Sequence, residues 1–248
     1  MFDRDCSPTC NRGPGRTTAA NRLVRLGLLA AGLCLGQAAL ASPPQRPPAA
    51  GTAAPGVAGL AGTHASADTR LVAAWVIRSG DNAGLPFVIV DKAEAKVLAF
   101  DPAGRLAGAT PALLGLARGD EIEPGIGDRP LADISPAQRV TPAGRFVAAL
   151  GEDLHSDVLW VDYDAALSLH RVVTNKPAER RLQRLATPTP KDNRISYGCI
   201  NVPAAFYDTV IRPMFKGTTG IVYILPETRS ASEMFFTPRP GQRASAKP

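Results

Sequence analysis

Cys199 is the residue of this 248-residue chain best suited to nucleophilic chemistry. It follows Gly198, and a small residue beside a nucleophile lets a substrate carbonyl approach a tight turn whose backbone N–H groups can stabilise an oxyanion. A cysteine thiol has a reference pKa of about 8.5, so the reactive thiolate needs a neighbouring base or imidazolium. Three histidines are available for that role, at positions 64, 155 and 170.

His170 is the preferred base because it belongs to a predicted strand over residues 167–173. Ser168, His170 and Val172 share one face of that strand, so the imidazole projects from a rigid element. A purely structural role in the core is the alternative for this histidine. His155, in a predicted loop, is the fallback base. Three scattered histidines and a single cysteine lack the spacing of a metal site, so the sequence predicts none.

The elements that must position these residues are mainly strands, with a few helices. Alternating and β-branched runs predict the strands, and three-four spacing of apolar residues predicts the helices. Strands are expected over residues 86–91, 96–101, 105–110, 146–150, 158–163, 167–173 and 220–225, and helices over 70–78 and 204–215. One more helix is expected within 174–194, with Leu182 and Leu185 on its buried side. The first two strands read as a hairpin, and residues 119–139 read as a loop.

The composition divides the chain into four segments. Residues 1–41 resemble a signal peptide, in which arginines precede the apolar run 26–35 and a small-x-small site ends at Ala41. Residues 42–70 read as a disordered linker rich in Pro and Ala, residues 71–226 as the folded domain, and residues 227–248 as a flexible tail that Phe235 and Phe236 tack to the surface. Cleavage after Ala41 would leave Cys199 as the only cysteine and exclude an internal disulfide. We expect a periplasmic or cell-envelope location, and an uncleaved anchor is the alternative.

The net charge of +6 does not indicate a nucleic-acid binder. The excess of basic residues lies in the two ends of the chain, whereas residues 71–226 carry 17 basic and 17 acidic side chains. The folded region therefore has no net charge with which to attract a polyanion or a membrane.

The segment Ser196-Tyr197-Gly198-Cys199-Ile200-Asn201 resembles the cysteine motif of the L,D-transpeptidase catalytic domain, the YkuD fold. Support comes from His170 on an earlier strand and from a Thr-Pro-x-Gly-x-Phe turn at residues 141–146. The likeness covers about residues 88–225. It departs from the family pattern at Tyr197, where a histidine is usual, and at Arg171. The gap of 29 residues between His170 and Cys199 is also longer than the family's, and we interpret the extra length as a helical insertion over the cleft.

The resemblance implies a β-sandwich-like catalytic domain that uses no cofactor and acts on peptidoglycan stem peptides. Cys199 would be the nucleophile and His170 the base. The backbone N–H groups of Tyr197, Gly198 and Cys199 would form the oxyanion hole, and Ser196 and Asn201 would support the loop.

Basic residues of the insertion are candidates to bind the carboxylates of a stem peptide, because arginine suits bidentate recognition. The candidates are Arg171, Arg180, Arg181, Arg184 and Arg194, and a solvated helix face is the alternative reading.

The sequence leaves the reaction open at one point. An amine as acyl acceptor makes the site a transpeptidase, whereas water makes it an L,D-carboxypeptidase or endopeptidase. The altered neighbours of His170 and Cys199 also permit a catalytically decayed module that binds peptidoglycan. Protein partners are not predicted.

Overall fold

A computed structural model describes residues 59–60, 62–153 and 156–236. The predicted signal peptide, its cleavage site, residues 42–58 of the linker, His155 and residues 237–248 lie outside the described residues. No helix in the described part of the chain is long and apolar enough to cross a membrane.

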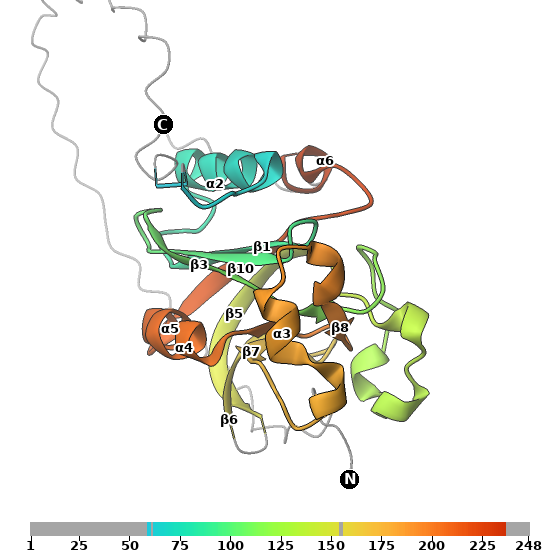
Figure 1. The fold of residues 1–248 in the computed structure, drawn as a ribbon. Helices are drawn as coiled ribbons and strands as arrows, with labels where there is room; N and C mark the ends of the chain where they lie inside the picture. Colours follow the sequence, from blue (N-terminus) through green and yellow to red (C-terminus); the bar gives the residue numbers. More distant parts are fainter. Residues whose placement is uncertain (1–58, 61, 154–155, 237–248) are drawn as a thin grey trace, which may run out of the picture. The chain divides into compact units, whose positions relative to one another are not determined.

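The core of the described fold is one mixed sheet of eight strands (Figure 1). Their order across the sheet is β3-β2-β1-β10-β5-β6-β7-β9. The strands are β1 (Phe87–Asp91), β2 (Lys96–Phe100), β3 (Leu106–Pro111), β5 (Gly144–Asp153), β6 (Ser156–Asp162), β7 (Leu167–Arg171), β9 (Ile200–Val202) and β10 (Thr219–Ile224). The short strands β4 (Leu114–Gly115) and β8 (Arg194–Ser196) form a separate parallel pair.

The hairpin predicted at the start of the domain is confirmed. β1 pairs antiparallel with β2, and β10 joins β1 on its other side in parallel. In β1 the side chains of Val88 and Val90 enter one hydrophobic core, whereas those of Phe87 and Ile89 enter a second. Both faces of this strand are therefore buried, which explains its unbroken apolar sequence.

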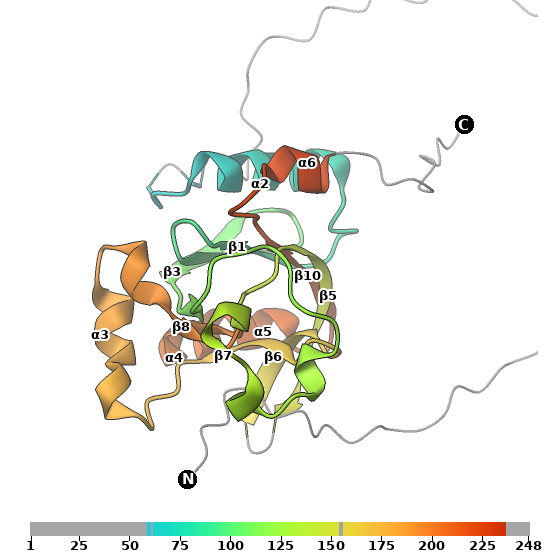
Figure 2. The ribbon, with the colours of Figure 1, turned by 90° about the vertical axis from the view of Figure 1, so that its right-hand side faces the viewer.

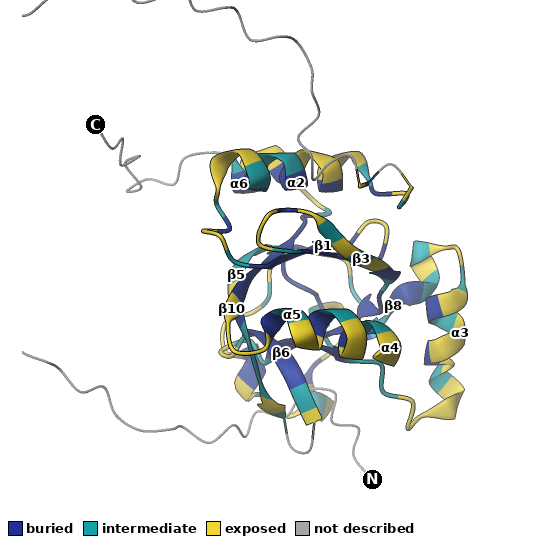
Figure 3. Ribbon diagram, turned by 90° about the vertical axis from the view of Figure 1, so that its left-hand side faces the viewer, coloured by how far each residue is buried: buried dark blue, intermediate teal, exposed yellow. Residues whose placement is uncertain are grey.

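The second core lies between the sheet and two helices, α2 (Ala67–Ser79) and α6 (Ala231–Phe235). The two helices lie side by side over β1 and β10, and their outward faces are exposed (Figures 2 and 3). Trp75 of α2 contacts both Phe235 and Phe236, with ring centroids 6.4 and 5.2 Å apart. Aromatic packing thus fastens the end of the described chain to its beginning.

The first core lies on the opposite face and joins the two halves of the sheet. Its buried residues come from β1 and β2 and also from β6, β7 and β9. The continuous helical segment α4 (Ala204–Phe206), η6 (Tyr207–Ile211) and α5 (Arg212–Phe215) adds Tyr207, Ile211 and Phe215 to the same core. The predicted class, mainly β with a few helices, is confirmed, and the sandwich-like layers are two halves of one curved sheet.

The folded domain extends beyond both of its predicted boundaries. The linker was expected to reach residue 70, but α2 begins at Ala67, with Ser66 as its N-cap, and Leu60 is fully buried in the second core. The tail was expected from residue 227, but the Glu227 side chain is only 1% exposed and α6 follows it. Composition missed these segments because their few apolar residues find partners only in the folded sheet.

The insertion between β7 and β8 contains the predicted helix, α3 (Arg181–Ala186), preceded by η4 (Pro177–Glu179) and followed by η5 (Pro190–Asn193). Its buried face was predicted incorrectly in part. Leu185 is buried as expected, but Leu182 is 58% exposed and Arg181 is buried instead. The contacts of Arg181 described below supply the reason.

A buried lysine ties the first half of the sheet to the segments that flank the site. The Lys92 side chain has no exposure to solvent, and its ammonium donates to the Asp120 carboxylate at 2.8 Å. It also donates to the carbonyls of Gly119 and Thr141. Glu227 is a second carboxylate, with Oε1 3.8 Å from the ammonium.

The two carboxylates are held by several further donors. Asp120 accepts from the backbone amides of Glu227 and Thr228, and Glu227 accepts from Arg118 and twice from Arg194. Burial alone would raise the pKa of Asp120 and of Glu227, but hydrogen bonds, led by Lys92 to Asp120 and by the Gly119 amide to Glu227, outweigh it and lower both below their ordinary values. Burial lowers the pKa of Lys92, and the ion pair with Asp120 opposes that change.

Substituting Lys92→Met should destabilise the fold by roughly 3–5 kcal/mol, because it leaves the buried Asp120 carboxylate without its closest cation. Urea denaturation measures the loss. Lys96→Met is the matched control: Lys96 is half-buried and donates only to the His64 carbonyl at 3.2 Å, so its loss should cost no more than about 0.5 kcal/mol. Equal costs for the two substitutions would contradict a structural role for the Lys92 network.

The same network predicts a loss of stability in acid. A carboxyl group with a lowered pKa in the folded protein stabilises it above the unfolded-state pKa, ordinarily 3.8 for Asp and 4.5 for Glu. That contribution disappears as the pH falls from those values toward the folded-state pKa. Urea midpoints measured from about pH 6 to about pH 2 should fall steeply below pH 4.5. The variant Asp120→Asn should be less stable at neutral pH and show a shallower fall, and an unchanged slope would exclude Asp120 as a source.

Candidate active site

Cys199 lies in a tight turn between β8 and β9 and is only 2% exposed. Ser196 fixes this turn from within. Its hydroxyl donates to the Cys199 carbonyl at 2.7 Å and accepts the Gly198 N–H at 3.2 Å. The Asn201 amide donates to the same carbonyl at 3.2 Å. The backbone of the cysteine is therefore held by the side chains of Ser196 and Asn201, before and after it.

Gly198 is required by the shape of this turn. Its φ of +143° is one that L side chains rarely adopt, and a Cβ there would lie 2.9 Å from the Val140 carbonyl oxygen. The Thr141 hydroxyl donates to the Gly198 carbonyl at 2.7 Å and accepts the Gly115 N–H at 2.8 Å. Thr141 is the first residue of the Thr-Pro-x-Gly-x-Phe turn, so that motif acts by holding the cysteine loop.

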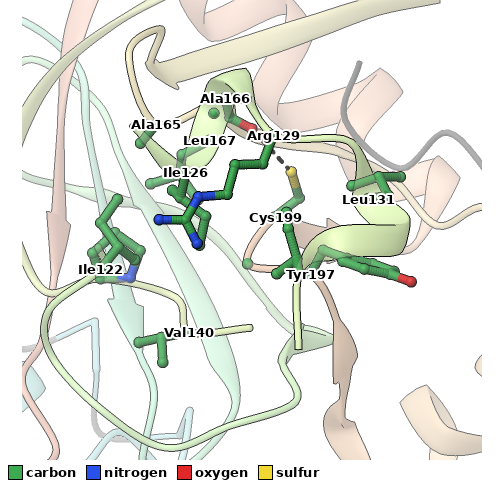
Figure 4. Close-up of a pocket in the computed structure, with 14 residues that line it drawn as sticks. Ile122, Ile126, Arg129, Leu131, Val140, Ala165, Ala166, Leu167, Tyr197 and Cys199 are labelled. Carbon is green, nitrogen blue, oxygen red and sulfur yellow. Dashed lines mark hydrogen bonds between the residues drawn. The ribbon is translucent and has the colours of Figure 1, made fainter. Parts of the chain in front are cut away.

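A pocket opens in front of Cys199 (Figure 4). The loop between β4 and β5 forms much of its wall, with the short helices η1 (Ile126–Asp128), η2 (Leu131–Asp133) and η3 (Pro136–Gln138). The lining residues are mostly apolar: Ile122, Ile126, Gly127, Arg129, Leu131, Ile134, Val140, Pro142, Ala165, Ala166, Leu167, Tyr197, Gly198 and Cys199. Arg129 extends across the pocket beside Ile126, and its guanidinium also pairs with Glu123 at 2.9 Å.

Two polar groups contact the Cys199 sulfur on the strand side of the pocket. The Ser168 hydroxyl donates to it at 3.7 Å, and the Ala166 carbonyl oxygen lies 3.5 Å away (Figure 4). The first contact favours a thiolate, whereas the second suits a protonated thiol. Nucleophilic chemistry at Cys199 requires the free thiol.

His170 lies on β7, which pairs in parallel with β9 so that His170 is opposite Asn201. The ring is 7% exposed. Its Nδ1 lies 2.7 Å from the Arg171 carbonyl oxygen, and Nε2 lies 3.4 Å from the amide nitrogen of Asn201. A carbonyl can only accept, so Nδ1 carries the proton and Nε2 offers its lone pair. This is the tautomer that a general base needs.

A carboxylate on β5 interacts electrostatically with the same imidazole. Burial raises the pKa of Asp153 above its ordinary value, and the nearby His170 opposes that rise. The Asp162 carboxylate, by contrast, accepts the amides of Asp164 and Ala165 in the β6–β7 turn. Asp153 is thus a carboxylate whose charge acts on His170.

The structure places His170 on β7 and Cys199 in the turn that leads into the neighbouring strand β9. Ser168 and His170 share one face of β7, as predicted, and the register pairs Leu169 with Ile200 and His170 with Asn201. Ser168 contacts the sulfur and His170 contacts Asn201. The sequence had identified the face but had not assigned Ser168 a role.

The prediction for the oxyanion hole needs a correction at Gly198, whose N–H already donates to Ser196. Tyr197 lines the pocket, and the Arg139 guanidinium lies 3.9 Å from its ring centroid. Arg139 also donates to the Ile134 carbonyl. This cation–π contact therefore joins the cysteine turn to the loop of residues 119–139 that lines the pocket, called the pocket loop below.

The five arginines proposed to bind substrate are absent from the pocket lining. Four have structural partners among the described residues. Arg171 pairs with Asp157 and Asp208, Arg184 donates to backbone carbonyls of its own insertion, and Arg194 pairs with Glu227. Arg181 binds Glu179 and Asn201. Arg180 is exposed at the N-cap of α3.

The pocket loop is the part of the site that sequence reasoning missed. Residues 119–139 read as turns, and no periodic pattern marks Ile122, Ile126 or Leu131 as lining a pocket. The available signal was a set of apolar residues spaced through an otherwise polar loop. Within the described residues, no group of three or more His, Cys, Asp and Glu side chains could hold a metal ion.

No protein-family model matches the chain, and the curated proteins include no significant match. Solved structures do include similar chains. One is the L,D-transpeptidase from Xylanimonas cellulosilytica, with 16% identity and a TM-score of 0.34 over 56% of this chain and 60% of that chain. Another is the LD transpeptidase LdtMt1 in complex with imipenem, with 14% identity and a TM-score of 0.33 over 56% and 58%. The match thus spans about three fifths of each of those chains, and at these values it assigns no activity.

Substituting Gly198→Ala should distort the cysteine turn, because the new Cβ would meet the Val140 carbonyl and the φ is unfavourable. We expect a loss of roughly 2–4 kcal/mol in stability and at least a tenfold slower alkylation of reduced Cys199 by iodoacetamide. Gly217→Ala is the control, since its φ is +75° but a Cβ there has no atom within 4 Å. Similar alkylation rates in the two variants would show that the Gly198 turn does not control the thiol.

Proposed function

We propose that this protein is an exported cysteine acyltransferase that acts on peptidoglycan stem peptides, as an L,D-transpeptidase does. One observation carries the proposal: Cys199 lines a largely apolar pocket from a rigid turn, beside a strand that presents a buried histidine in its basic tautomer. The motif around Cys199 adds the resemblance to the L,D-transpeptidase domain described above.

The first half of the reaction forms a thioester. His170 Nε2 exchanges its 3.4 Å hydrogen bond from Asn201 for the proton of the Cys199 thiol, and the sulfur attacks the carbonyl carbon of a peptide bond in the donor stem. The amides of Tyr197 and Cys199 are the proposed donors to the resulting oxyanion, and the Ser168 hydroxyl stabilises the thiolate before attack. The C–N bond then breaks, and His170 returns its proton to the departing amine.

The second half transfers the acyl group. An amine of a second stem attacks the thioester, His170 takes its proton, and the carbon–sulfur bond breaks to regenerate the thiol as the new amide forms. Water in place of the amine gives a carboxylate and makes the same site a carboxypeptidase. The apolar pocket wall favours the amine reaction to the extent that it excludes water.

The pocket also indicates which part of the donor it accepts. Its lining combines apolar side chains with the Arg129 guanidinium. We therefore assign carboxylate recognition to Arg129 rather than to the insertion. A short peptide with small apolar side chains and one carboxylate fits this combination.

Export is part of the proposal because of the cysteine count. Cys6, Cys10 and Cys34 all lie in the proposed signal peptide, so its removal leaves Cys199 without an intramolecular disulfide partner. The periplasm or cell envelope is also where peptidoglycan is found. The reduced thiol is the active form in this scheme.

The test is incubation of the reduced chain with disaccharide-tetrapeptide fragments, with the products read by mass spectrometry. We expect a cross-linked dimer that has lost one D-alanine, because thioester formation expels the terminal residue before the second stem attacks. Cys199→Ala should give no product. His170→Gln should fold normally and react about 100-fold to 10,000-fold more slowly.

Two other outcomes would change the proposal. Release of D-alanine without a dimer would identify a carboxypeptidase. If no product forms and Cys199 alkylates no faster than Cys6, Cys10 and Cys34 of the same reduced chain, the protein is a module that binds peptidoglycan without processing it.

A further inference from the structure

Arg181 is a buried cation on an otherwise exposed insertion. Its side chain is 3% exposed, whereas the next residue of α3, Leu182, is 58% exposed. Figure 3 shows α3 largely exposed at the edge of the sheet. Burying a guanidinium is costly unless it is paired and hydrogen-bonded, so the inward position of Arg181 requires specific partners.

Those partners lead directly to the candidate active site. Arg181 Nη1 donates to Asn201 Oδ1 at 3.0 Å, and Nε donates to Glu179 at 2.5 Å. Asn201 is fully buried, and its amide nitrogen lies 3.2 Å from the Cys199 carbonyl oxygen and 3.4 Å from His170 Nε2. One amide therefore joins the insertion, the cysteine turn and the histidine.

Donors and acceptors can be assigned in only one way along the series of hydrogen bonds from Arg181 through Asn201 and His170 to the Arg171 carbonyl. A guanidinium donates and never accepts, so Arg181 fixes the oxygen end of the Asn201 amide toward itself. The nitrogen end, which only donates, must then face His170 and the Cys199 carbonyl. At the far end the Arg171 carbonyl only accepts, and it takes the Nδ1 proton. The imidazole between these two groups is held neutral, with Nε2 as the acceptor.

We propose that Arg181 is a positioning residue that keeps His170 in its basic form through Asn201. A protonated His170 would present an N–H to the N–H of Asn201, so the chain of donors disfavours the imidazolium. This inference rests on the proposed role of His170 as the base. It gives the insertion a function other than the binding of stem peptides.

The charged groups around His170 have opposing effects on its protonation. Arg181 on α3 disfavours the imidazolium, whereas Asp153 on β5 favours it and the Cys199 sulfur does so when ionised. Glu179 partly neutralises Arg181 from the exposed side of the insertion. Removing Arg181 should therefore shift the balance toward the protonated histidine.

The experiment is a ¹⁵N NMR titration of the histidines in the full reduced chain, in which His170→Gln identifies the His170 signals. In Arg181→Met the titration midpoint of His170 should rise by about one pH unit, because the variant loses both the nearby charge and the fixed amide. The pH at half-maximal alkylation of Cys199, followed by peptide mass mapping, should fall, because a protonated His170 favours the ionised sulfur. Arg181→Lys should restore part of the shift.

Two variants separate this role from a general effect on the insertion. Arg184→Gln removes bonds to the Glu179 and Asp192 carbonyls without touching Asn201, and it should leave the midpoint unchanged. Glu179→Gln keeps the Arg181–Asn201 bond but removes its counter-charge, so the midpoint should fall. An unchanged midpoint in Arg181→Met, or an equal rise in Arg184→Gln, would overturn the inference.

The readouts remain decisive if Arg181→Met does not fold. Wild-type ¹⁵N shifts should then show neutral His170 protonated at Nδ1, and Glu179→Gln should still lower the midpoint. A proton at Nε2, or no shift in Glu179→Gln, would count against the proposal. Neither readout uses a peptide substrate, so failure of the transpeptidase reaction with these shifts intact would reject the proposed function and leave the role of Arg181 standing.

Discussion

The buried ammonium of Lys92 is the interaction on which the geometry of the site depends. It follows β1 and binds the carbonyl of Thr141, and the hydroxyl of Thr141 in turn holds the carbonyl of Gly198. The cysteine turn is therefore connected to the centre of the sheet through two hydrogen bonds. Because Asp120 and Glu227 neutralise the lysine from the other side, the same charge also fixes the chain that leads into α6.

Strand order explains how distant segments meet at Cys199. β9 pairs in parallel with β7, and β8 pairs in parallel with β4. The turn between β8 and β9 thus bridges the large sheet and the small one, and both ends of the cysteine motif are held in place. Leu113 and Asn201 exchange two backbone hydrogen bonds that reinforce this junction. A nucleophile placed on such a junction needs little reorganisation before attack.

The sequence predicted those features that local pattern determines. Alternation gave the hairpin and the shared face of Ser168 and His170, and the glycine before Cys199 gave the turn. Burial of charge was not predictable, because the spacing that marked Leu182 as buried cannot show that Asn201 offers a partner to Arg181. Lys92 was missed for the same reason. The pocket loop, with Ile126 and Arg129, has no periodicity, and its conformation depends on contacts such as Arg139 with Tyr197.

The position of Arg181 also gives a physical reason for the long gap between His170 and Cys199. The residues between β7 and β8 form η4, α3 and η5, and their polar contacts are largely internal, such as Arg184 with Asp192. From α3, the Arg181 side chain points into the site and donates to Asn201. Its hydrogen bond sets which end of the Asn201 amide faces the imidazole, and an amide without it could present either end. A longer connection is compatible with a working base when it supplies the donor that fixes this choice.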